Sequence, residues 1–242
     1  MKKLIFVVII AILIPGIGIG LYFLIPHLTV VPVEGGQITN TNIHVIKNGL
    51  SNVFLLKVET DYIMFDTGSD ANKLKTSLED ANINVLDIKW IFISHSDSDH
   101  VAGLNIFPNA EIFMSADELP LINGSQKRFG IFKNNKLPSG INIDNINLLQ
   151  NQTLLFSDIK IECIKTPGHT IGSMVYLVND QYVFTGDAFR VKNGNILVHP
   201  FPMDRKLSIN SIKQLKEIIN SSSIIATSHY GYYNKLSFDI IK

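Results

Sequence analysis

The chain has 242 residues with 21 basic and 21 acidic side chains, so its formal net charge is zero. This length suits one sizeable domain rather than two large ones, and the balanced charge argues against a nucleic-acid partner, which normally requires a basic excess. The single cysteine, Cys163, excludes an internal disulfide bond and a cysteine-based metal site.

The N-terminal part of the chain is strongly apolar. After two lysines, an uncharged stretch runs from Leu4 to Ile25. About 20 apolar residues span a bilayer, whereas the apolar region of a signal peptide has about 7 to 15. We therefore expect a transmembrane helix in residues 1–27, which anchors the protein with the rest of the chain outside the cytoplasm. The small residues Gly18 and Gly20 leave cleavage open, and a cleaved protein would be secreted.

A linker and a group of short strands are expected next. Residues 28–41 contain prolines and glycines typical of a linker, so the folded domain is expected to span residues 42–242. Within it, Ile43–Ile46, Asn52–Val58 and Tyr62–Phe65 are apolar or alternating runs that predict strands. The first two are separated by an Asn-Gly pair, which is a turn signal.

Asp66 directly follows the third of these runs. A carboxylate at a strand end can orient neighbouring metal ligands, which is one role open to Asp66. Aspartate is also a common turn residue, so a purely local role stays open. Apolar residues then recur at helical spacing over residues 71–81, which predicts a helix packed on the sheet.

The densest group of chemically active side chains lies in Ser94–His100, after the apolar run Trp90–Ile93. Imidazole nitrogens and carboxylate oxygens are ligands of borderline and hard divalent ions. The alternate spacing of His95, Asp97 and Asp99 puts them on one side of an extended segment, from which they can reach two adjacent ions. The competing interpretation is a helix N-cap, because Asp and Ser favour that position.

A long segment without clear periodicity follows two predicted short helices, 101–107 and 116–122, and a strand, 110–114. Residues 123–153 are rich in Asn and Gly, which is typical of a lid or a binding loop. The segment carries four basic residues, Lys127, Arg128, Lys133 and Lys136. Their charge could favour an anionic substrate, but a solvated face explains it more simply.

Further candidate ligands follow strand-like runs in the C-terminal half. The predicted strands are 159–164, 173–178, 181–184 and 223–227, and the predicted helix is 207–219. His169, Asp187 and His229 follow such runs, as His95 does. Ligands gather at strand ends on one edge of a layered α/β domain, so we expect these residues at one site. The remaining histidines, His27, His44 and His199, are placed outside it.

These motifs, in this order, resemble those of the metallo-β-lactamase-fold hydrolases. Ser94–His100 is similar to the family's Thr/Ser-His-x-His-x-Asp-His motif, and Pro167–Thr170 matches its Pro-Gly-His-Thr motif. Gly186-Asp187 matches the Gly-Asp pair, and His229–Gly231 matches the final His-x-Gly. The resemblance covers nearly everything after the linker. It implies an α/β fold, the αββα sandwich of this family.

The resemblance also implies a centre of two divalent metal ions, expected to be Zn²⁺, with Mn²⁺ or iron as alternatives. One ion would be held by His95, Asp97 and His169, the other by Asp99, His100 and His229, with Asp187 bridging them. Asp99 would also be the catalytic residue, as proton acceptor or donor beside the nucleophile, and Asp66 would orient a ligand. Asp97 departs from the family, which commonly has histidine there. Its added negative charge predicts a less acidic centre that better tolerates iron or manganese.

The implied function is hydrolysis of a small molecule by hydroxide bound between the metals. An ester, thioester or lactone is the expected substrate, because the true β-lactamases of the fold lack a bridging aspartate at the position of Asp187. β-Lactamase-like amide hydrolysis is one alternative. Di-iron redox chemistry is another, because the di-iron enzymes of this fold have an acidic residue at the position of Asp97. A non-catalytic exported binding protein is a third, although all the ligand positions carry competent donors.

Overall fold

The computed structural model describes residues 30, 33–128, 135–219, 223–234 and 236. The predicted membrane anchor, residues 1–27, lies outside the described residues. Among those that are described, no helix has the length and apolar character needed to cross a membrane. Residues from Pro32 onward group into one unit by their internal contacts, and the fold and the site both belong to it.

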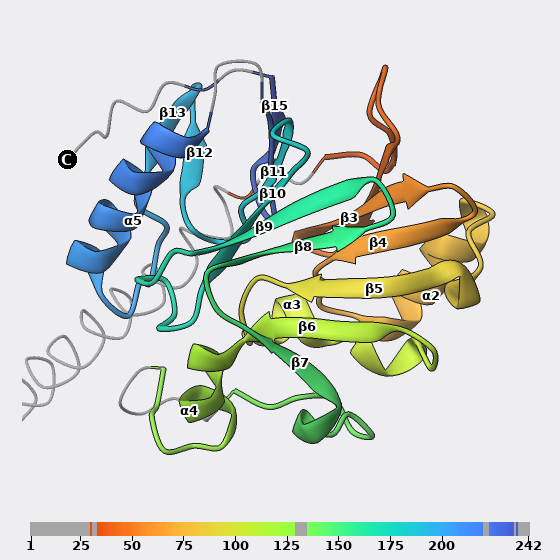
Figure 1. The fold of residues 1–242 in the computed structure, drawn as a ribbon, viewed down its shortest axis with the longest axis horizontal. Coiled ribbons are helices and arrows are strands. Elements are labelled where there is room, and N and C mark those ends of the chain that lie inside the picture. Colours follow the sequence, from red (N-terminus) through yellow and green to blue (C-terminus); the bar gives the residue numbers. More distant parts are fainter. Residues whose placement is uncertain (1–29, 31–32, 129–134, 220–222, 235, 237–242) are drawn as a thin grey trace, which may run out of the picture. The chain divides into compact units, whose positions relative to one another are not determined.

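The first sheet contains seven strands among the described residues, arranged in chain order (Figure 1). They are β1 (Gly36–Gln37), β2 (Ile43–Asn48), β3 (Ser51–Val58), β4 (Asp61–Phe65), β5 (Ile88–Ile93), β6 (Glu111–Ser115) and β7 (Ile146–Leu149). Strands β1 to β4 pair antiparallel, and β4 to β7 pair parallel. The carboxyl ends of β4, β5 and β6 therefore lie at one edge of the sheet.

The second sheet has the order β15-β14-β11-β10-β9-β8. Its strands are β8 (Gln152–Phe156), β9 (Ile159–Lys165), β10 (Met174–Val178), β11 (Tyr182–Phe184), β14 (Ile224–Thr227) and β15 (Gly231–Tyr233). Strands β11 and β14 are parallel, so the residues that follow them leave the same edge. A separate hairpin joins β12 (Arg190–Lys192) to β13 (Asn195–Leu197).

Side-chain alternation along the strands divides the core into layers. Phe92 packs between the two sheets with Tyr176, whereas its neighbour Ile91 packs on the opposite face with Leu74 of helix α2 (Ala71–Asp80). In the second sheet, Leu177 packs with helix α5 (Arg205–Ile218). The layers are therefore helix, sheet, sheet and helix, which confirms the predicted αββα sandwich (Figure 1).

Hydrogen bonds join the two sheets close to the predicted site. The amide of Met174 at the start of β10 donates to the carbonyl of Ser94, which follows β5, at 2.9 Å. The Tyr176 hydroxyl donates to the carbonyl of Ile93 at 2.6 Å. The amide of Asn52 on β3 donates to the carbonyl of Ser228 at 2.6 Å. These bonds fix the loops after β5 and β14 relative to each other.

Three segments differ from the sequence-based expectation. Residues 123–153, predicted to be irregular, include β7, whose end residues Ile146 and Leu149 are buried against β6. Part of the predicted linker, residues 28–41, belongs to the fold, because β1 pairs with β2 and Ile38 is buried in the core. The helix predicted over 101–107 is instead two short pieces. These are α3 (Ser98–Val101) and a 3₁₀ turn at Leu104–Ile106.

The loop that carries His169 packs closely on α5, and a substitution at Gly168 in this loop tests that packing. A Cβ atom at Gly168 would lie 2.3 Å from the backbone nitrogen of Ser208, and its φ is +143°. We expect Gly168→Ala to lower the free energy of unfolding by about 1–3 kcal/mol, because the backbone has to shift. Gly140→Ala is the matched control, since Gly140 has φ +90° and open space around it. Equal urea midpoints for the two variants would contradict this packing.

Candidate metal centre

The loop after β5 carries four candidate ligands, of which His95 and Asp97 belong to one group of donors and Asp99 and His100 to another. His95 is fully buried, and Asp97 stands at the N-cap position of α3. The Asp97 side chain makes no capping hydrogen bond among the described residues. Asp99 and His100 lie in the first turn of α3. The N-cap interpretation therefore accounts for the place of Asp97 but not for what its carboxylate does.

A first triad of donors consists of His95, Asp97 and His169. Asp97 Oδ2 lies 3.3 Å from His95 Nε2 and 3.3 Å from His169 Nε2. One donor atom from each residue lies within 4.8 Å of the others. The three residues predicted to hold one ion are thus brought together from the loops after β5 and β9.

A second triad consists of Asp99, His100 and His229. Asp99 Oδ2 lies 3.3 Å from His229 Nε2 and 3.8 Å from His100 Nε2. These donors also lie within 4.8 Å of one another. His229 follows β14, so this triad joins the first sheet to the second.

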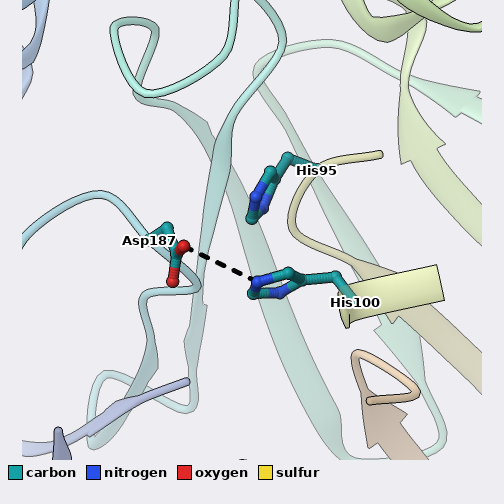
Figure 2. A group of neighbouring side chains, drawn as sticks. All are labelled: His95, His100 and Asp187. Atoms are coloured by element: carbon teal, nitrogen blue, oxygen red, sulfur yellow. Dashed lines mark ion pairs between the residues drawn. The ribbon is translucent and has the colours of Figure 1, made fainter. Parts of the chain in front are cut away.

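Asp187 lies between the two triads. Its Oδ2 is 3.3 Å from Nε2 of His169, and its Oδ1 is 3.3 Å from Nε2 of His229. Figure 2 shows the same carboxylate facing His100, with His95 beside it. Its Oδ2 lies 3.7 Å from Nε2 of His100. Oδ1 therefore faces a histidine of the second triad, and Oδ2 faces one histidine of each triad. The carboxylate thus lies between the two groups of donors.

Gly186 allows this close approach of Asp187 to the loop after β5. Its φ is +50°, and a Cβ atom there would lie 2.4 Å from Cβ of Ser94. A larger residue at this position would push the two loops apart. The Gly-Asp pair in the sequence thus has a steric reason for its glycine.

Asp66 orients both His100 and the loop. Its Oδ2 lies 2.8 Å from Nδ1 of His100. Its Oδ1 accepts from the backbone amide of Ser94 at 2.8 Å. A carboxylate on one ring nitrogen fixes the tautomer and leaves the other nitrogen as a donor atom for a metal. Asp66 also has a turn conformation, with φ +58°, so both roles expected for it are combined.

Glu118 is a buried carboxylate that the sequence analysis did not single out. Its Oε2 accepts hydrogen bonds from the amide of Ser96, at 2.7 Å, and from the Ser96 hydroxyl. Its Oε1 accepts from the amide of Gly172 at 2.9 Å. It thereby ties the loop after β5 to the loop that carries His169. A single glutamate in a short apolar segment gave no signal of this role.

Arg128 was expected on a solvated face, but it is buried at the first triad. Its Nε lies 2.8 Å from both carboxylate oxygens of Asp97. Its guanidinium also lies 2.7 Å from Nε2 of His169 and donates to the His169 carbonyl. The side chain is buried because it has a charged partner there, which a count of basic residues could not show. It offsets the negative charge that Asp97 adds.

His199 also lies at the site, contrary to expectation. It belongs to a third group of donors, with His169 and Asp187, whose atoms lie within 4.8 Å of one another. It comes two residues after β13, in a segment with no motif. His44 lies on β2, outside these groups, and His27 lies outside the described residues.

Opposite charges set the protonation states of these side chains. Burial alone would lower the pKa of His229, but the carboxylates of Asp187 and Asp99 raise it to about 10. Burial likewise opposes the charged form of His100, yet Asp66, Asp99 and Asp187 hold its pKa well above the usual range. Burial would raise the pKa of Asp99, whereas His100 and His229 hold it below its usual value. The carboxylates are therefore ionised and are neutralised by cationic partners.

The donor atoms fit divalent metal ions. Nε2 of His95, Nε2 of His100 and Oδ1 of Asp187 are buried and have no hydrogen-bond partner among the described residues. Most buried polar atoms have one, because an unpaired buried polar atom is costly. A cation would provide the missing interaction. Imidazole and carboxylate donors without thiolates suit zinc, manganese and iron.

The chain is similar to known proteins. The chain matches the family described as the metallo-beta-lactamase superfamily over residues 46–221. A probable metallo-hydrolase of Methanocaldococcus jannaschii is 29% identical over 177 residues, which cover 72% of this chain and 73% of that protein. A probable polyketide biosynthesis zinc-dependent hydrolase of Bacillus subtilis is 29% identical over 133 residues, which cover 54% of this chain and 50% of that protein.

A more distant relative and a solved structure extend the comparison. A probable hydroxyacylglutathione hydrolase of Encephalitozoon cuniculi is 22% identical over 189 residues, which cover 78% of this chain and 61% of that protein. The metallo-beta-lactamase superfamily protein from Sulfolobus tokodaii has a TM-score of 0.60 at 20% identity, covering 80% of this chain and 82% of that one. At that identity the structural likeness shows the fold alone.

The raised pKa values predict how pH affects the metal-free protein. In the folded state His229 stays protonated up to its pKa of about 10, and His100 stays protonated well above the usual range. The unfolded chain releases both protons near 6.5, the ordinary pKa of histidine. Their stabilisation is complete below 6.5 and is lost as pH rises through the folded pKa. The free energy of unfolding of chelator-treated protein should therefore be lower at about pH 8.5 than at about pH 7, by at most about 1.4 kcal/mol per pH unit for each histidine. A lower urea midpoint at the higher pH would report this loss.

His229→Gln tests the cause of this effect, because the urea midpoint of this variant should depend less on pH. His44→Gln should keep all of the pH dependence, because His44 lies outside the cluster. A midpoint that stays constant or rises over this interval would contradict the charge pairing at the centre.

Proposed function

Because this chain belongs to the metallo-beta-lactamase superfamily, as its motifs predicted, we propose that it is a hydrolase with a binuclear metal centre. The position of Asp187 carries this proposal. Its two oxygens each lie 3.3 Å from a histidine of a different triad, so one carboxylate can contact two ions. The buried donor atoms without protein partners support the same assignment.

In the proposed centre, each triad would hold one ion, and Asp187 would be shared between them. Two such ions would lower the pKa of a bound water towards about 7 and polarise a substrate oxygen. The protein residues position these groups. Asp66 holds the His100 ring through Nδ1, and the Leu50 carbonyl lies 2.8 Å from Nδ1 of His229. In each ring, Nε2 is the atom left to face the centre.

Asp99 is the proposed catalytic residue. Its side chain is 39% exposed, compared with 19% for Asp97 and 5% for Asp187, so it is the carboxylate that a substrate reaches most easily. Its pKa is held below the usual value, so it is ionised. An ionised Asp99 can accept a hydrogen bond from the attacking water and orient it towards the substrate carbon.

An ester, thioester or lactone is the proposed substrate class. The position of Asp187 between the two triads supports it, and one relative is named a probable hydroxyacylglutathione hydrolase. β-Lactamase-like hydrolysis of an amide is the alternative within the same chemistry. Both use a carbonyl carbon attacked by water, so a panel of substrates separates them.

Zinc is the proposed metal, with manganese or iron as alternatives. A relative named as a zinc-dependent hydrolase supports zinc. Asp97 in place of the family's histidine favours the harder ions and keeps di-iron redox chemistry as the second candidate function. The pairing of Asp97 with Arg128 weakens that second candidate, because it cancels the added charge.

A direct test combines metal analysis with turnover. The purified protein should contain about two zinc ions and hydrolyse a thioester, a lactone or an aryl ester. Chelation should abolish turnover and added zinc should restore it. His229→Ala should lower kcat/KM by about 100-fold or more, whereas His44→Ala should leave it unchanged. Turnover that survives both chelation and His229→Ala would contradict the proposal, and two iron ions would favour the redox candidate.

The apolar segment of residues 4–25 supports a membrane location for the full chain, with the catalytic domain outside the cytoplasm. The full chain should sediment with membranes, resist extraction by high salt and be released by detergent. Protease added outside intact cells should degrade the catalytic domain. A shortened protein in the medium would indicate cleavage and secretion instead. Full-length protein in the soluble fraction of lysed cells would contradict both locations.

A further inference from the structure

His199 packs against two of the proposed ligands. Its ring lies 4.6 Å from the ring of His169 and 5.8 Å from that of His229, measured between ring centres. Only 8% of the residue is exposed. Its Nε2 lies 3.4 Å from Oδ2 of Asp187, the oxygen that also faces His169. A histidine outside every motif of the family therefore reaches the bridging carboxylate.

The hydrogen bond on the other side of the His199 ring fixes its tautomer. Nδ1 lies 2.9 Å from the carbonyl oxygen of Pro200. A carbonyl only accepts, so Nδ1 carries the hydrogen and donates it. In the neutral ring, Nε2 then carries the lone pair. This is the same orientation that the Leu50 carbonyl gives to His229.

The lone pair of His199 Nε2 therefore points at an acceptor. Asp187 Oδ2, 3.4 Å away, is an acceptor as well, so it cannot donate a hydrogen to this lone pair, whereas a cation beside both atoms would satisfy them. Nε2 of His199 is buried and has no hydrogen-bond partner among the described residues. The same holds for Nε2 of His95 and of His100, which belong to the two triads.

We propose that His199 is an additional metal ligand, which donates Nε2 to the ion held by His95, Asp97 and His169. This inference rests on the proposed binuclear centre. Its basis is the third donor group, in which His199, His169 and Asp187 have their donor atoms within 4.8 Å of one another.

The additional ligand makes the two metal positions unequal. The first position would then have five protein donors, namely His95, Asp97, His169, Asp187 and His199. The second would have four, namely Asp99, His100, His229 and Asp187. A catalytic metal keeps a coordination position free for water or substrate. The second position is thus the one that binds substrate, which agrees with the greater exposure of Asp99.

The test compares metal binding by the full chain and two variants. His199→Asn keeps an amide N–H that can donate to the Pro200 carbonyl but removes the donor at the Nε2 position. His44→Asn makes the same change on β2, outside the cluster. For each protein, the two dissociation constants for Zn²⁺ are measured by competition with a chelator. The visible absorption spectrum of the Co²⁺-loaded protein reports the ligands of each ion, and circular dichroism checks the fold.

If His199 is a ligand, His199→Asn raises one dissociation constant by about tenfold or more and leaves the other within about twofold. The Co²⁺ spectrum of the weakened position changes as well, whereas His44→Asn matches the unsubstituted chain. Unchanged dissociation constants with an unchanged Co²⁺ spectrum would overturn the proposal. An equal rise in both dissociation constants with an unchanged Co²⁺ spectrum would overturn it as well. If the unsubstituted chain binds one ion or none, the binuclear centre itself fails, and the assignment of His199 fails with it.

Discussion

The position of Asp187 between two sets of histidines is the constraint on which the site depends. It requires the end of β11, in one sheet, to meet the loop after β5, in the other. The hydrogen bond from Met174, at the start of the neighbouring strand β10, to Ser94 joins the two sheets beside this point, and Gly186 provides the space for the close approach. The αββα sandwich therefore determines where the site forms. Two sheets packed face to face place loops from both at one edge, where neither sheet alone could supply both triads.

Charge balance explains how so many carboxylates can be buried together. Burial disfavours each ionised group, and the compensation comes from cationic partners close beside the carboxylates. Asp66, Asp99 and Asp187 keep His100 and His229 protonated in the metal-free protein, so protons occupy positions that metals would take. Asp97 has a permanent partner, Arg128. The substitution that separates this chain from the usual family pattern therefore comes with its own counter-charge.

The sequence predicted the parts of the site that depend on local spacing. The loop after β5 and the residues after β9, β11 and β14 were recognisable because ligands follow strand-like runs directly. Residues whose role depends on a distant partner could not be predicted. Glu118 and Arg128 reach the site from the segment after β6, and His199 reaches it from a loop without a motif. The strand β7 was missed for the same reason, since its burial comes from β6 rather than from its own pattern.

The most direct measurement is a crystal structure of the zinc-loaded protein, with data collected on both sides of the zinc absorption edge. The account predicts two anomalous peaks per chain, one at His95, Asp97 and His169 and one at Asp99, His100 and His229, with Asp187 in contact with both. A single peak, or two peaks that Asp187 does not join, would contradict the bridging carboxylate and the binuclear hydrolase derived from it.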